Sequence, residues 1–390
     1  MNKVPSLDIS IFEDVIANGG ADRRMALARQ LAALVADSRT PPGEREDVTP
    51  CLLKLLMDPV KDIRAEIIRI LRPVAGLHPD IVFAIAADEE DIALPFLNLS
   101  PSVTGVRQMA VFKAGDVLRR KALARRCDVD ARVVEAIALE GEAETVLELL
   151  NNPALQLDNA SAKRIYVRFR DDARITGLLL ERPDLPLEIR IAHVRTTSEK
   201  LRAHMNKTGW LAANDAGDVI AETEERAMVD ILARARDSEE LMASIGFMSR
   251  KNALTPSVIL RAACHGHVAV LEHALAHLSG MSPKRVHRLA CGKGALSLRA
   301  IYNKSGLPQS CFMLVRAIFD VARALEQHSF GKARLSPEAF GRKVLERMAA
   351  GYGMIPVAEK ARLIDLLARF ADDDTREMAR RLGAGLQKAA

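Results

Sequence analysis

Short helical runs that end at a proline-bearing corner recur along the first half of this chain, and they limit the fold more than any other feature of the sequence. Leucine-rich stretches end shortly before Pro101, Pro153 and Pro183, and Val129 occupies the same place in a fourth stretch. These four positions are 28, 24 and 30 residues apart. Because proline lacks the amide hydrogen that a helix interior needs, the chain must turn at each corner. The sequence therefore predicts helix pairs whose apolar faces are buried only when neighbouring pairs stack.

The clearest of these pairs covers residues 46–76. Its first helix reaches a corner at Asp58-Pro59, and its second helix follows over residues 62–71. The apolar side chains of the second helix recur at helical spacing and predict one buried face, made by Ile63, Ile67, Ile70 and Leu71.

The corner segment Asp58-Pro59-Val60-Lys61-Asp62-Ile63-Arg64 resembles the corner between the two helices of a HEAT repeat. This resemblance implies that Asp62 and Arg64 brace neighbouring repeats and are structural. Asp22-Arg23-Arg24-Met25-Ala26-Leu27 is a weaker copy of the same segment, one repeat earlier.

Residues 206–217 interrupt the helical pattern, since they are rich in Gly, Asn and Asp. We therefore expect HEAT-like helical repeats over residues 1–205, a hinge or loop at 206–217, and a second helical domain over 218–390. Aromatic residues make up only 4% of the chain, and alanine, leucine and arginine abound, which favours helix over strand. The predicted fold class is all-α, an α-solenoid of HEAT-like helix pairs followed by the second helical domain. In that domain we expect helices at 218–235, 238–249, 256–264, 268–279, 283–290, 295–304, 309–327, 337–350, 356–371 and 374–385.

Residues 254–308 carry a second resemblance. Their elements Gly280-Met281-Ser282-Pro283-Lys284-Arg285-Val286 and Lys304-Ser305-Gly306-Leu307-Pro308 are similar to a bacterial family catalogued only as a domain of unknown function that follows HEAT-like repeats. This resemblance implies a shared layout over most of the chain. It implies no activity, cofactor or site.

Charge is distributed unevenly along the chain, although the overall net charge is only +5. Residues 241–390 hold 23 lysines and arginines against 11 aspartates and glutamates, whereas residues 1–240 hold 33 against 40. Between Glu272 and Asp320 the sequence has no acidic residue. Lys284 and Arg288 are four residues apart on a predicted helix and share one exposed sector. The candidate partner-binding or anion-binding residues are therefore Lys284, Arg285, Arg288, Lys293, Arg299 and Lys304.

Three interpretations of this basic flank remain open. A protein partner with an acidic surface would complement it, so that the chain acts as an interaction scaffold or adaptor. Nucleic acid would be bound without sequence readout through its phosphates, and two helices over residues 282–303 would suit a groove. Against nucleic acid, only Tyr302 offers an aromatic ring nearby. The third interpretation is a solvated basic face that keeps the protein in solution. The sequence favours the first, and leaves the partner and the oligomeric state open.

The sequence shows no signature of catalysis or of a cofactor. It contains neither a G-x-S-x-G elbow nor a P-loop, and no strand precedes a G-x-G-x-x-G motif. His273 and His277 stand four apart, and Cys264, His265 and His267 lie just upstream, but the order differs from that of a zinc protease. We therefore predict a non-enzymatic protein without a bound metal or cofactor.

The sequence shows no signal for secretion and no membrane-spanning segment. The N-terminal residues carry Pro5 and Asp8 where a secretion signal needs an apolar run, and no stretch is apolar enough to span a membrane. The five cysteines are widely spaced, which predicts small buried thiols rather than disulfides. We expect a soluble cytoplasmic protein that does not enter a membrane.

Overall fold

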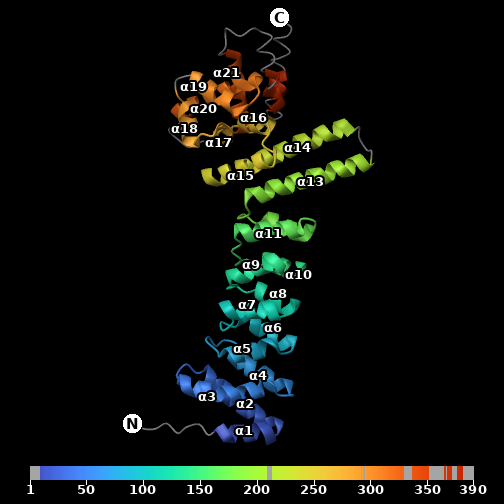
Figure 1. Cartoon of the computed structure of the whole chain (residues 1–390), viewed down its shortest axis with the longest axis vertical. Helices are drawn as coiled ribbons and strands as arrows, with labels where there is room; N and C mark the ends of the chain where they lie inside the picture. The colour runs from blue at the N-terminus through green and yellow to red at the C-terminus, as the bar shows by residue number, and fades with distance from the viewer. Residues whose placement is uncertain are drawn as a thin grey trace. The chain divides into compact units, whose positions relative to one another are not determined.

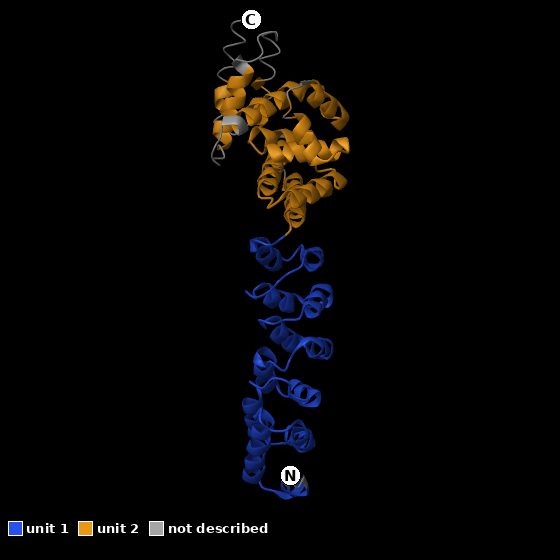
Figure 2. Cartoon of the chain, turned by 90° about the vertical axis from the view of Figure 1, so that its left-hand side faces the viewer, with its two compact units in different colours: residues 1–185 blue, residues 186–390 orange. Residues whose placement is uncertain are grey.

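Helix is the only regular secondary structure in the residues that the structure describes, which confirms the predicted all-α class. The structure is a computed structural model, and it describes residues 9–208, 213–290, 292, 295–328, 336–350, 364–365, 367–370 and 376–380. The chain divides into two compact units, residues 1–185 and residues 186–390 (Figure 2).

The first unit is built from two rows of helices (Figure 2). Odd-numbered helices pack on the next odd-numbered helix along one row, and even-numbered helices pack on the next even-numbered helix along the other. Consecutive helices therefore alternate between the rows. The helices are α1 (Ile9–Asn18), α2 (Ala21–Ala36), α3 (Pro42–Leu55), α4 (Lys61–Leu71), α5 (Pro79–Ala86), α6 (Glu90–Leu99), α7 (Gly105–Ala114), α8 (Val117–Ala124), α9 (Ala131–Glu140), α10 (Ala143–Leu150), α11 (Asn159–Phe169) and α12 (Ala173–Glu181).

The apolar faces predicted from helical spacing form the core of this unit. In α4 the side chains of Ile63, Ile67 and Leu71 are fully buried, whereas Ile70 is half-buried at the edge of the face. Helices α6, α8, α10 and α12 end at Leu99, Ala124, Leu150 and Glu181, directly before the corners that hold positions 101, 129, 153 and 183. The predicted corners are thus confirmed.

Buried polar side chains join successive corners. Arg64 donates hydrogen bonds to both carboxylate oxygens of Asp88 from Nε, at 3.0 and 3.1 Å, and to the backbone carbonyl of Asp58 at 2.8 Å. Arg24 of α2 donates from Nε to Asp58 at 2.7 Å. Because the bonds of Arg64 to Asp88 and of Arg24 to Asp58 connect residues 24 and 34 apart in sequence, they fix one helix pair against the next.

The brace predicted for Asp62 is provided by another residue. Asp62 is exposed and forms no ion pair with a described residue, whereas the carboxylate of Asp58 is buried. Asp58 also accepts the backbone amide of Val60 at 2.8 Å, which turns its carboxylate into the corner. Arg64 is structural, as the resemblance implied. Its acidic partners are Asp88 and Glu89, while the carboxylate of Asp58 pairs with Arg24.

The boundary between the units lies between Leu185 and Pro186, about twenty residues before the predicted end of the first domain. Helix α13 (Leu187–Thr208) belongs to the second unit because it packs along α14 (Ala213–Ala233). Ile191 of α13 shares an apolar core with Met228 and Val229 of α14. Of the predicted hinge at 206–217, residues 206–208 end α13 and residues 213–217 begin α14, while 209–212 lie outside the described residues.

From α15 (Ser238–Arg250) onward, the described helices of the second unit agree closely with those expected from the sequence, whereas α13 was not among the expected helices and α14 begins at Ala213, inside the predicted hinge (Figure 1). Four of them begin and end at the predicted residues: 256–264, 268–279, 283–290 and 337–350. Most of the predicted helices at 356–371 and 374–385 lies outside the described residues. After α14 the unit continues with α15 (Ser238–Arg250), α16 (Pro256–Cys264), α17 (Val268–Ser279), α18 (Pro283–Ala290), α19 (Ala295–Ser305), a short 3₁₀ helix (Gln309–Cys311), α20 (Phe312–His328) and α21 (Pro337–Ala350).

Candidate basic surface on α18 and α19

Helix α18 is short and strongly amphipathic. It follows the left-handed C-cap Gly280, whose φ of 68° suits a residue without a Cβ, and it begins at Pro283. Val286 and Ala290 are buried against the core of the second unit, which orients the helix. Leu289 is half-buried against the same core, and this packing leaves Lys284, Arg285, His287 and Arg288 exposed.

Three cations lie on the exposed side of α18. Lys284, Arg285 and Arg288 are all exposed. Since each residue turns a helix by about 100°, Lys284 and Arg288 lie opposite the buried Val286. Among the described residues, none forms an ion pair with Lys284, Arg285 or Arg288. These positive charges are available to a ligand.

His287 lies on the same helix, beside these cations. Its Nδ1 is 2.8 Å from a carboxylate oxygen of Glu272 on α17. Glu272 is the acidic residue at the start of the long acid-free stretch, and its side chain is largely buried. Its charge is thus directed at His287.

Helix α19 carries the next two predicted residues, Arg299 and Lys304, and both are exposed. The guanidinium of Arg299 lies 5.5 Å from the centre of the Phe312 ring, at the start of α20. Lys304 lies in the last turn of α19, where a cation also complements the helix dipole. The two are five residues apart and point to different sides of the helix. Lys293, the sixth predicted residue, lies outside the described residues.

Tyr302 holds α19 against the core and cannot act as a platform for nucleic-acid bases. Its side chain is fully buried, and its hydroxyl donates to the carbonyl of Pro308 at 2.6 Å. Its ring meets Phe312 edge-on at 5.3 Å. Burial raises the pKa of the Tyr302 hydroxyl well above its usual range.

The corner between α18 and α19 is anchored from α20. Arg323 donates from Nη1 to the carbonyl of Gly292 at 3.2 Å and from Nη2 to Asp320 at 2.6 Å. This contact joins Gly292, which lies between α18 and α19 in the sequence, to α20.

The cations of the first unit contrast with those of α18. Many of its arginines lie within 3 Å of a carboxylate on a neighbouring helix or corner, for example Arg29 with Glu66, Arg125 with Glu148 and Arg164 with Glu135. Among the described residues, the cations of α18 therefore differ from these arginines of the first unit, which have a carboxylate partner.

The histidines and cysteines do not form a metal site in the described part of the chain. His273 is buried, with Nδ1 at 2.8 Å from the carbonyl of Ala269 and Nε2 at 2.6 Å from the hydroxyl of Ser238, whereas His277 is exposed. No group of three potential ligands gathers among the described residues. Cys51, Cys264 and Cys311 are buried thiols as expected, but Cys127 is exposed because it lies in the corner after α8; Cys291 lies outside the described residues.

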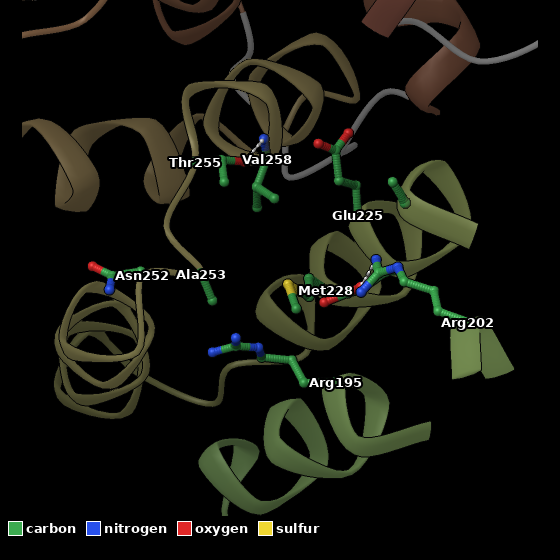
Figure 3. A pocket seen from close by; sticks show the side chains of 10 residues that line it. Arg195, Arg202, Glu225, Met228, Asn252, Ala253, Thr255 and Val258 are labelled. Carbon is green, nitrogen blue, oxygen red and sulfur yellow. Dashed lines mark hydrogen bonds and ion pairs between the residues drawn. The ribbon is translucent and has the colours of Figure 1, made fainter. Parts of the chain in front are cut away.

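A small cavity of about 180 Å³ lies between α13, α14 and the start of α16 (Figure 3). Its charged side chains are engaged with protein groups: Arg195 donates to the carbonyl of Lys251 at 2.6 Å, and Arg202 donates to Glu224 at 2.6 Å. Glu225 accepts from Ser257 at 2.7 Å. These charged side chains of the cavity are therefore engaged in hydrogen bonds and an ion pair within the protein.

No helix in the described part of the chain combines the length and the apolar character needed to cross a bilayer.

Comparison with known proteins gives one match. The model of a family described as "Uncharacterised protein conserved in bacteria (DUF2336)" matches residues 92–357, which include the last helices of the first unit and the basic surface. No curated protein and no solved structure matches the chain.

Proposed function

This chain belongs to DUF2336, a family of uncharacterised proteins conserved in bacteria, and we propose that it is a non-enzymatic scaffold that binds the acidic surface of a protein partner. The binding surface consists of the exposed cations Lys284, Arg285 and Arg288 of α18, extended by Arg299 and Lys304 of α19. Complementary charge would speed the encounter with the partner and select it over neutral or basic surfaces.

The single observation that carries this proposal is the unpaired state of the α18 cations. Holding Lys284, Arg285 and Arg288 together on eight residues of helix is unfavourable in itself, because like charges repel at this spacing. No described acidic residue forms an ion pair with any of the three. A partner that supplies carboxylates would relieve that repulsion.

For the first unit we propose a HEAT-like α-solenoid. The two rows of helices and the polar braces between successive corners support this architecture. Stacked helix pairs offer long exposed surfaces of the kind that scaffolds use. We place the scaffold in the cytoplasm, in keeping with Cys51, Cys127 and Cys311, which form no disulfide with a described residue.

The test compares two double variants with the same change in charge. Lys284→Glu/Arg288→Glu reverses the charge of α18, and Arg342→Glu/Lys343→Glu reverses two exposed cations of α21 that form no ion pair with a described residue. Each full-length protein is used to capture partners from the source cell, and captured proteins are quantified by mass spectrometry. We expect one or a few acidic proteins to be retained by wild type and by the α21 variant, and to be lost at least about tenfold with the α18 variant.

Two outcomes would contradict the proposal. If all three proteins capture the same set, α18 is not the docking surface. If the wild type binds random duplex DNA or RNA with an affinity that falls steeply with salt, and the α18 variant loses that binding, the ligand is nucleic acid and not an acidic protein.

A further inference from the structure

We infer that the partner docks through an amphipathic helix, which lays apolar side chains on Leu296 and Ala300 of α19 and places carboxylates against the cations beside them. This inference rests on the proposed function and specifies the chemistry of the partner. It adds an apolar contact, centred on Leu296, to the basic surface of α18 and α19, which the sequence predicted from charge alone.

The first observation is a continuous exposed stripe along α19. Leu296, Arg299, Ala300 and Asn303 are all exposed, and they stand at positions i, i+3, i+4 and i+7. This spacing places them on one side of the helix. The opposite side of α19 is buried and made by Leu298, Ile301, Tyr302 and Ser305.

The second observation is the exposure of Leu296 itself. Its side chain is 84% exposed, a larger fraction than for any other large apolar residue among those described. Leu296 lies in the first turn of α19, and the opposite side of this helix is packed into the core through Leu298, Ile301 and Tyr302. An exposed apolar side chain on a helix packed in this way offers a defined contact, and burying it strengthens binding.

The third observation is the arrangement of charge around the stripe. At about 100° per residue, Arg299 and Lys304 lie on opposite flanks of the line through Leu296 and Ala300. Helix α18, which contacts α19, contributes Lys284, Arg285 and Arg288. An apolar line with cations beside it is complementary to a helix that has an apolar line with carboxylates beside it.

Small side chains favour a helix as the bound element. Ala300 in the middle of the stripe lets a second helix approach closely, and the i, i+3, i+4, i+7 pattern matches the ridges of such a helix. A purely polyanionic ligand would use the cations but would gain nothing from Leu296 or Ala300.

The experiment uses the full-length chain and two synthetic fluorescent peptides. Both are 18-residue helical peptides with the same glutamates; one has leucines along a single face, and the other has glutamines in their place. Binding is followed by fluorescence anisotropy at several salt concentrations. The variant Leu296→Gln keeps a good helix former at an exposed position, so folding is preserved. The matched control is Leu139→Gln, at a leucine of α9 that is 61% exposed.

We expect the wild type to bind the leucine peptide at least about tenfold more tightly than the glutamine peptide. Leu296→Gln should remove most of that difference while leaving the salt dependence unchanged, since the cations remain. Leu139→Gln should bind both peptides as the wild type does. The α18 charge variant Lys284→Glu/Arg288→Glu should weaken the binding of both peptides.

The failure of this inference can be told apart from failure of the proposed function. If the α18 charge variant abolishes peptide binding but Leu296→Gln binds the leucine peptide as tightly as wild type, the apolar contact is refuted and the acidic partner stands. If neither peptide binds, or if duplex DNA or phosphatidylglycerol vesicles displace the leucine peptide and bind more tightly than it does, the helical partner is refuted.

Discussion

Arg64 shows at the level of a single residue how the first unit is held together. Its side chain is 11% exposed and that of Asp88 is 7% exposed, so removing Arg64 leaves the buried Asp88 carboxylate without its cation. We predict that Arg64→Met lowers the free energy of local unfolding by about 3 kcal/mol, because breaking a buried pair is far more damaging than losing an exposed one. Hydrogen–deuterium exchange of the amides in α3 to α6 measures this change.

The control for this prediction is Arg69→Met. Arg69 lies on the same helix and pairs with Glu66, but its side chain is 66% exposed. Exchange in α3 to α6 should change far less than with Arg64→Met, because solvent screens this exposed pair. Equal effects of the two substitutions would show that Arg64 is not a brace.

Glu66 predicts a pH dependence of stability. Hydrogen bonds from Arg69 and Arg29 lower the pKa of its carboxyl from 4.5 to about 2. A pKa that is depressed by folding contributes stability above the unfolded-state value, and this contribution is lost as the pH falls from about 4.5 toward 2. We therefore expect Glu66→Gln to lower the urea midpoint at pH 7 and to match the wild type near pH 2.

Glu46→Gln serves as the control for the pH prediction, because Glu46 is exposed and forms no ion pair with a described residue. The urea midpoint of Glu46→Gln should equal that of the wild type at every pH from 7 to about 2. A gap between Glu66→Gln and wild type that is constant from pH 7 to pH 2 would contradict the linkage.

The sequence predicted part of this residue-level detail. It identified Arg64 and the exposed cations of α18, because buried and exposed sides of a helix follow from spacing. It chose Asp62 over Asp58, since spacing does not show which of two corner acids turns inward; the hydrogen bond from Val60 to Asp58 decides that. It also passed over Leu296, because only the structure shows that this leucine is left uncovered.

At the scale of elements, the sequence predicted where helices begin and end better than it predicted which helices pack against each other. Helices α16, α17, α18 and α21 have the predicted bounds because Pro at the first position and Gly at the C-cap act locally. Whether residues 206–217 separate two domains or lie inside one depends on long-range helix contacts, which the local sequence does not encode. A stretch rich in Gly, Asn and Asp breaks a helix equally well between two domains and inside one. Here the contacts of α13 with α14 place it within the second unit.

At the scale of the whole molecule, the two compact units differ in charge. Residues 1–185 hold 25 lysines and arginines against 29 acidic residues, and residues 186–390 hold 31 against 22. The structural boundary therefore preserves the charge asymmetry that the sequence shows. Every predicted binding residue lies in the second unit.

This boundary makes a prediction about two fragments of the chain. Fragment 186–390 keeps α13 beside α14, with the core contact of Ile191 and the ion pair between Arg202 and Glu224 at 2.6 Å. Fragment 206–390, which begins at the boundary that the sequence suggested, loses nearly all of α13 and leaves that apolar surface of α14 uncovered.

We expect 186–390 to unfold cooperatively in urea and to bind the leucine peptide as tightly as the full chain, because α18 and α19 are complete in it. Fragment 206–390 should unfold at a lower urea concentration or aggregate. If both fragments show the same urea midpoint, α13 does not belong to the core of the second unit. The second domain would then begin after residue 205, as the sequence predicted.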